Sequence, residues 1–210
     1  MLFLLLPLLL SPPQGWASDR VSFPRGPAEI KAEISATSPP SLSIVGDAGE
    51  VLLRVNYRLG PVDQAVEISN PMRFQVVDTP EIGPLVIGVA GSPGGSDASF
   101  ETVVIGEVEG SLQELLPVHL NTSIQDAVCV GRFGSSKRLG IAVATFIWGH
   151  EIHYAPHRYD VSLYLWNGRA FEPSLHHRSS RRHVSFRGAL AELGLRCRYD
   201  FVRALLPEFH

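Results

Sequence analysis

Hydrophobic and polar residues alternate with a period of two along most of the chain. In residues 28–35 (AEIKAEIS), every second side chain is apolar and the side chains between them are polar or charged. Residues 51–59 (VLLRVNYRL) repeat the pattern, and the side chains expected to face the core are Val51, Leu53, Val55 and Tyr57. Because successive side chains of a strand point to opposite faces, this pattern predicts strands with one buried and one exposed face.

Further apolar segments of strand length are separated by glycine and proline. They lie at residues 73–77, 84–90, 100–109, 126–133, 139–148 and 159–166. A series of short strands with turn signals between them predicts antiparallel sheets rather than alternating strands and helices. Residues 38–41 and 91–99 are predicted to be flexible connections. Ser111 with Glu114 is predicted to cap a single helical turn.

Only the C-terminal part has a helical period. From residue 189 to residue 206, apolar residues recur at steps of three or four. Gly194 would interrupt this helix and Pro207 would end it. We therefore predict an all-β protein of mainly antiparallel sheets, sandwich or propeller-like, with a short C-terminal helical tail. Its predicted parts are a signal peptide (1–17), a β domain (18–173), a basic linker (174–187) and a helical tail packed on the β domain (188–210).

The segments 139–148 and 159–166 are predicted to pair as a hairpin. Ile141 would share one face of this hairpin with Val161. Ala142 would share the other face with Ser162. Both faces would be largely apolar, which is typical of strands in the middle of a sheet.

The connection between these two strands is the candidate binding site. Residues 149–157 (GHEIHYAPH) contain three histidines and a glutamate, and the connection is longer than most hairpin turns. Long loops on a rigid hairpin often carry binding groups. The candidate ligand-binding residues of this loop are His150, Glu151, His153, Tyr154 and His157.

The same loop raises the question of a metal. A zincin helix needs the spacing H-E-x-x-H, whereas this chain has H-E-x-H, with Tyr154 at the position of the second ligand. Pro156 also prevents a helix from continuing through the loop. A loop site for zinc or copper stays open on residue chemistry alone. We favour a polar turn, and no metal or other cofactor is predicted.

A basic segment follows the last predicted strand. Residues 174–187 (SLHHRSSRRHVSFR) contain four arginines, three histidines and no acid. Clustered guanidinium groups can hold a phosphate, sulfate or carboxylate, which makes Arg178, Arg181 and Arg182 candidate ligand-binding residues. The alternative, a solvated linker, is the interpretation we favour.

The remaining motifs do not name a reaction. The glycine-rich residues 88–96 lack the lysine of a phosphate-binding loop, and Ser92 lacks the flanking residues of a nucleophile elbow. Aromatic residues are frequent between 146 and 171, and we favour the packed face of a sheet over a platform for sugars.

Composition and the N-terminus predict where the protein acts. Residues 2–10 are apolar except for one proline, and Gly15 and Ala17 stand where a signal peptidase reads small residues, so we expect an export signal cleaved after Ala17. No later segment is apolar enough to predict a transmembrane segment. The net charge is −3 and the pI is about 6.2, which disfavours nucleic-acid binding.

The two cysteines have two interpretations. In an oxidising compartment, Cys129 and Cys197 could form a disulfide that closes a long loop. Alternatively, both remain thiols, with Cys129 serving as a small core residue in the apolar run AVCV.

Residues 128–173 carry a resemblance to a known family. RYDVSLYLWNGRAFEP (158–173) resembles a hairpin of exported bacterial β proteins of unknown function, and VCVGRFGSSKRLGIAVATF (128–146) is similar to a degenerate FG-GAP-type propeller repeat. Where that repeat has calcium-binding aspartates, this chain has Ser135, Ser136 and Lys137, so the resemblance implies no calcium site. It brings no catalytic residue either.

We therefore predict a secreted or periplasmic binding or interaction domain, with a protein or glycan partner in the envelope. One alternative is a metal-dependent hydrolase that uses the histidines of the 150–157 loop, with Glu151 as base. Another is a structural module of an envelope assembly. Enzymatic activity is not the favoured interpretation.

Overall fold

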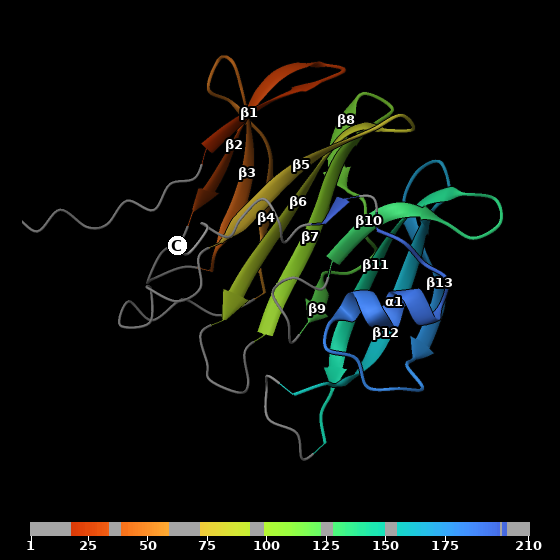
Figure 1. Cartoon of the computed structure of the whole chain (residues 1–210). Helices are drawn as coiled ribbons and strands as arrows, with labels where there is room; N and C mark the ends of the chain where they lie inside the picture. Colours follow the sequence, from red (N-terminus) through yellow and green to blue (C-terminus); the bar gives the residue numbers. More distant parts are fainter. Residues whose placement is uncertain are drawn as a thin grey trace, which may run out of the picture.

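Three antiparallel sheets and one short helix make up the described part of the chain (Figure 1). The computed structural model describes residues 18–33, 39–58, 72–92, 99–122, 128–149, 155–197 and 199–200. This architecture confirms the predicted all-β class. Within these ranges, no helix has the length and apolar character needed to cross a membrane.

The strands follow the chain from sheet to sheet. The first sheet contains, in spatial order, β1 (Ser18–Phe23), β2 (Gly26–Glu33), β3 (Ser41–Gly46) and β4 (Val51–Asn56). The middle sheet contains β5 (Arg73–Thr79), β6 (Gly83–Ser92), β7 (Ser99–Val108) and β8 (Ser111–Glu114), with β9 (Leu120–Thr122) paired to the other end of β7. The third sheet contains β13 (Phe171–Arg178), β12 (Arg158–Trp166), β11 (Arg138–Ile147), β10 (Val128–Phe133) and β14 (Tyr199–Asp200).

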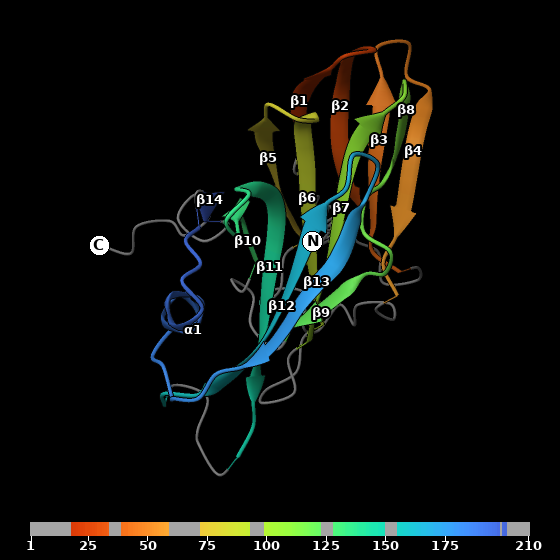
Figure 2. The ribbon, with the colours of Figure 1, turned by 90° about the vertical axis from the view of Figure 1, so that its right-hand side faces the viewer.

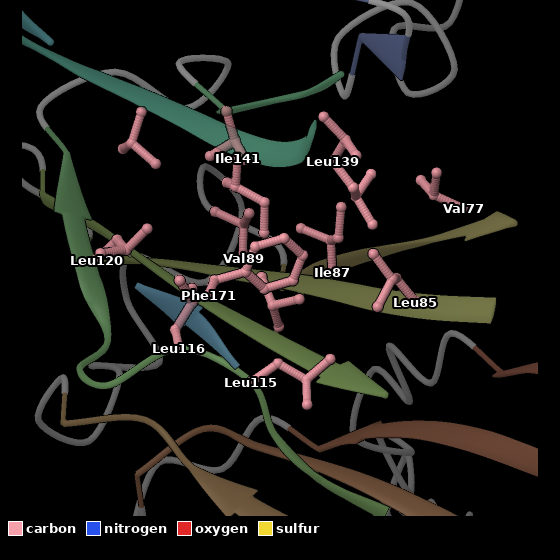
Figure 3. Close-up of a cluster of buried hydrophobic side chains, with 14 of the residues drawn as sticks. Val77, Leu85, Ile87, Val89, Leu115, Leu116, Leu120, Leu139, Ile141 and Phe171 are labelled. Atoms are coloured by element: carbon pink, nitrogen blue, oxygen red, sulfur yellow. The ribbon is translucent and has the colours of Figure 1, made fainter. Parts of the chain in front are cut away.

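The middle sheet is covered on both faces. On β6, Val86 and Ala90 belong to the core shared with the first sheet, whereas Ile87 and Val89 belong to the core shared with the third sheet. Figures 1 and 2 show the three sheets as successive layers. In Figure 3, side chains of β6 meet Ile141 of β11 across the second of these cores. An apolar strand with alternating side chains therefore supplies both cores at once.

A fourth layer covers the outer face of the third sheet. Helix α1 (Phe186–Glu192) packs Ala189 and Leu190 against the face of the third sheet that carries Ala142 and Val161 (Figure 1). Ala142 on β11 and Ala189 on the helix are both fully buried in this contact.

A disulfide joins the chain after α1 to the third sheet. The sulfur atoms of Cys129, on β10, and Cys197 are bonded, with their Cα atoms 5.5 Å apart. Cys129 is fully buried. The bond closes a loop across a sequence separation of 68 residues.

Each predicted strand has a counterpart, but two local predictions are wrong. Residues 111–114 form β8 instead of a helical turn, because Glu109 and Gly110 both have positive φ (52° and 76°) and turn the chain back as a tight hairpin. Val51, expected to face the core, is 58% exposed. The pairing of β3 with β4 shifts register between Ile44, which lies opposite Leu53, and Val45, which lies opposite Val51. This irregularity interrupts the alternation of faces at the start of β4, so Val51 does not follow the pattern of the rest of the strand.

The predicted faces of the β11–β12 hairpin are also wrong. Ile141 lies opposite Tyr164, and both side chains belong to the core against the middle sheet. Ala142 and Val161 share the opposite face, under the helix. A shift of one residue moves every side chain to the other face, and the long connection between these strands does not fix the register.

The C-terminal region differs from the predicted linker and tail. Residues 174–178 belong to β13. Helix α1 spans 186–192, so of the predicted helix 189–206 only residues 189–192 are helical among the residues that the structure describes. Gly194, with a φ of 69°, follows the helix end, and Tyr199–Asp200 pairs with β10. The predicted leader (1–17) and residues 201–210 lie outside the described residues.

Removing the disulfide should lower the free energy of unfolding. For a loop of this length, we expect a C129A/C197A variant to lose about 4 kcal/mol, because its unfolded chain is no longer constrained. Urea unfolding of the variant and of the wild type, each with and without reductant, measures the effect. Wild type in reductant should approach the variant. Equal stability of all four samples would contradict the expectation.

Candidate functional site

Most of the predicted loop site lies outside the described residues. The residues outside the described ranges are His150, Glu151, His153 and Tyr154. His157 is described, and its side chain is 1% exposed and stacks on Phe146 with ring centroids 4.1 Å apart. This imidazole is therefore part of an aromatic core rather than an exposed ligand group.

The backbone of His157 pairs with His183, at the end of the segment that follows β13. The two residues form an isolated antiparallel bridge, in which His157 N donates to His183 O (3.0 Å) and His183 N donates to His157 O (2.8 Å). The bridge fixes the base of the predicted binding loop next to the basic segment.

Two exposed apolar side chains lie beside this bridge. The Trp148 ring meets the His157 ring at 5.2 Å between centroids, yet Trp148 is 43% exposed. Val184, the neighbour of His183 in the chain, is 86% exposed. We call Trp148, His157, His183 and Val184 the bridge surface.

The segment between β13 and α1 is held in place by hydrogen bonds. Ser179 N donates to Tyr159 O, and Tyr159 N donates to the Ser179 hydroxyl, both at 2.8 Å. That hydroxyl in turn donates to Arg181 O at 2.9 Å. Ser179 is 2% exposed, so this segment, residues 179–185, is anchored to β12 at its start. We call it the arginine loop.

Glu192, the last residue of α1, holds the arginine loop from the other side. Its Oε1 accepts a hydrogen bond from the backbone N–H of Ser180 at 2.7 Å. Its Oε2 lies 2.8 Å from His183 Nε2, and His177 Nε2 lies 3.6 Å from Oε1. The Ser180 N–H, followed by the Ser180 hydroxyl and His183, holds the pKa of Glu192 well below its usual 4.5.

The three predicted arginines lie on exposed positions of this region. The Arg178 side chain is 73% exposed, and its Nε lies 3.5 Å from Asp160 Oδ2. His176 Nε2 lies 3.0 Å from the other oxygen of this carboxylate, Oδ1. Arg181 and Arg182 are exposed on the arginine loop. The structure therefore brings the basic segment and His157 together, whereas the sequence treats them as separate candidates.

A metal site is not formed by the described residues. Among them, no group of three or more histidine, cysteine, aspartate or glutamate side chains is arranged to hold a metal ion. The metal-dependent alternative rests on loop residues outside the described ranges.

A second polar cluster, between the first and middle sheets, was not predicted. Glu101 on β7 is 1% exposed and accepts the backbone N–H of Arg58, just after β4, at 2.8 Å. Its other oxygen contacts His119 Nδ1, and His119 Nε2 lies 2.8 Å from Glu114 Oε2. An ionised carboxylate can accept a hydrogen bond but cannot donate one. Two hydrogen bonds from one ring to two carboxylates therefore require a proton on both nitrogens of His119, or a proton on either Glu101 or Glu114. Its clearest role is to tie the end of β4 to the middle sheet.

Tyr57 lies beside this cluster without entering its hydrogen bonds. The side chain is 1% exposed, and its hydroxyl has no hydrogen-bond partner among the described residues. Burial, followed by the charges of Glu101 and Glu114, raises the pKa of Tyr57 well above its usual 10.0. The hydroxyl lies directly over Gly88, where a Cβ would be 2.4 Å from it. The phenol is therefore a neutral packing group.

Comparisons with known protein families, with curated proteins and with solved structures find no match for this chain. The resemblance of residues 128–173 to FG-GAP-type repeats therefore stays a prediction.

The contact between Tyr57 and Gly88 predicts an energetic coupling. Gly88→Ala alone should cost about 1–3 kcal/mol, because the new methyl group overlaps the Tyr57 hydroxyl. Tyr57→Phe removes a buried hydroxyl without a partner and should stabilise by about 1 kcal/mol. In the Phe background, Gly88→Ala should cost about 1 kcal/mol less than in the wild type. Urea unfolding of the four proteins measures this coupling, and strictly additive costs would contradict the packing.

Glu192 predicts a dependence of stability on pH. Its pKa is lowered in the folded protein, so its contribution is present above about pH 4.5 and is lost as the pH falls further. Glu192→Gln should therefore be less stable than wild type at pH 7, and the two should converge towards pH 2. Urea midpoints across this range measure the difference. Glu172→Gln, at an exposed acid on β13, is the control and should change the midpoint little. A constant gap between wild type and Glu192→Gln would contradict the prediction.

Proposed function

We propose that this protein is an exported binding domain whose contact surface is the bridge surface together with the arginine loop. The observation that carries the proposal is the exposure of Trp148, whose ring contacts His157, and of Val184, which follows His183 in the chain, at the His157–His183 bridge. Single exposed apolar residues are common on soluble proteins. An indole and a valine exposed at one backbone bridge, beside several arginines, are typical of a contact surface.

The rigidity of the underlying framework supports this role. The bridge has two backbone hydrogen bonds, the Phe146 ring stacks under His157, and Ser179 anchors the arginine loop to β12. A surface that is ordered before it meets its partner loses less conformational entropy on binding. The interactions around Glu192 and Ser179 therefore serve binding as well as stability.

Two features support export. The apolar leader at residues 1–17 has the pattern of a signal peptide, and the Cys129–Cys197 disulfide is a bond that persists in oxidising compartments. The proposal places the mature domain in the periplasm or outside the cell. A partner in the envelope, either a protein or a glycan, would meet it there.

Site-specific cross-linking in the producing cell tests the proposal. A photoreactive amino acid at position 184 should give a discrete cross-linked species. The same amino acid at position 51, which is 58% exposed on the first sheet, is the matched control and should not give that species. Adding Trp148→Ala should weaken binding on the order of tenfold and reduce the yield accordingly.

The proposal fails if position 184 gives no species, or if position 51 gives the same one. It also fails if Trp148→Ala leaves the yield unchanged. Thermal unfolding of each variant shows whether the protein under test is folded, and Trp148→Ala should retain its fold because Trp148 is partly exposed.

A further inference from the structure

One face of the β12–β13 pair carries a serine, a histidine and an aspartate side by side. Ser162 and Asp160 are two residues apart on β12, so their side chains lie on the same face of the third sheet. On β13, His176 is paired directly with Ser162. Tyr159 and Val161, which alternate with these residues along β12, belong to the core under α1. The register of the two strands therefore brings the three polar groups together on the face that α1 does not cover.

The three side chains meet in the order of a hydrogen-bond relay. Ser162 Oγ lies 3.4 Å from His176 Nδ1, and His176 Nε2 lies 3.0 Å from Asp160 Oδ1. An ionised carboxylate only accepts hydrogen bonds, so the neutral ring carries its proton on Nε2, which faces Asp160. The lone pair of Nδ1 then faces the Ser162 hydroxyl. The imidazole is therefore placed to take the proton of this hydroxyl.

The Asp160 carboxylate is held between two cationic partners. Its Oδ2 lies 3.5 Å from Arg178 Nε. Its Oδ1 is shielded from solvent and has no aligned hydrogen bond from the described residues, so the nearby Nε2–H of His176 is the donor that this oxygen needs. Contacts between catalytic groups are often poorly aligned until a substrate binds. The contact between Asp160 and His176 should shorten when the ring takes up a proton and becomes positively charged.

The serine end of the relay is open to solvent. The His176 side chain is 64% exposed and Ser162 is partly exposed, whereas the Asp160 side chain is only 20% exposed. The nucleophile and its base can therefore meet an external molecule, while the group that orients the base lies deeper. Arg158 and Arg178 are exposed on the same face, one two residues before Asp160 and the other opposite it. Their positive charge favours negative charge that develops at this face during a reaction.

We propose that Ser162 is a nucleophile for carboxylic esters, with His176 as its general base and Asp160 as the residue that positions the base. Polar side chains paired across two strands are often only a stabilising contact. The order serine, imidazole and carboxylate is the arrangement that activates a serine, and it is recognised by geometry on unrelated folds. This activity goes beyond the proposed binding function and does not depend on it, because none of the three residues belongs to the bridge surface.

The proposed reaction is an acyl transfer to Ser162 followed by hydrolysis. Ser162 Oγ forms a bond to the carbonyl carbon while its proton passes to His176 Nδ1, and the π electrons of the carbonyl move to its oxygen. The carbonyl then re-forms, the bond to the alcohol oxygen breaks, and this oxygen takes the proton from Nδ1. Water attacks the acyl group on Ser162 with the help of the same base. The carboxylic acid is released and the hydroxyl is restored.

Labelling with a fluorophosphonate tests the nucleophile in the wild-type, disulfide-bonded protein. An activated serine displaces fluoride from this reagent, so peptide mass spectrometry should find one phosphonyl group, on Ser162. Ser174, an exposed serine on the same strand as His176, is the internal control and should stay unlabelled. Protein unfolded in urea should not be labelled, because the relay is then absent. No label on Ser162, or equal labelling of Ser174, overturns the proposal.

Hydrolysis of p-nitrophenyl acetate tests the pairing of nucleophile and base. Ser162→Ala and His176→Gln should each lower kcat/KM by about a hundredfold, the lower end of what a general base contributes. Ser174→Ala should leave kcat/KM unchanged. An exposed imidazole can hydrolyse this activated ester alone, so full activity in Ser162→Ala together with loss in His176→Gln overturns the role of the serine. Urea unfolding checks that each variant is folded, as expected for side chains that are at least partly exposed.

Asp160 acts through His176, and a different readout tests this positioning role. Asp160→Asn should lower kcat with little change in KM, because it removes the group that orients the ring without touching the ester. Asp160→Glu keeps a carboxylate and should recover part of kcat. An equal loss in the two variants, or a change in KM alone, overturns the role given to Asp160.

Discussion

Burial of both faces of the middle sheet is the constraint on which the rest of the structure depends. Along β6, neighbouring side chains such as Val86 and Ile87 point to opposite faces, and both are buried. Each buried apolar side chain contributes about 1.5–3 kcal/mol, but only when something covers it. The first sheet covers one face and the third sheet the other. The third sheet is itself apolar on its outer face, and α1 covers that face.

Polar contacts then align these layers. Glu107 accepts the backbone N–H of Arg25 at one end of β7, and Glu101 accepts that of Arg58 at the other, so two carboxylates of the middle sheet hold two ends of the first. In the same way, Glu192 on α1 and Ser179 next to β12 hold the arginine loop through hydrogen bonds with backbone N–H groups. The bridge surface is thus carried on a framework that these hydrogen bonds hold in place.

Alternation in the sequence was sufficient to predict the class of fold and most strands. It failed at the β11–β12 register, because both faces of that hairpin are apolar and only the packing of Ile141 against the middle sheet chooses between them. The arginines and His157 were candidates from the sequence, but the backbone bridge that joins their segments was not predicted. The contact between Arg58 and Glu101 spans 43 residues, and no local pattern marks such a pair.

Amide hydrogen exchange tests the central claim most directly. If the middle sheet is buried between two layers, the amides in the centres of β6 and β7 should be the slowest in the protein and should exchange only through global unfolding. Amides of the outer strands β1 and β13 should exchange faster. Rapid exchange in the centre of β6, under conditions in which β1 or β13 stays protected, would contradict the account.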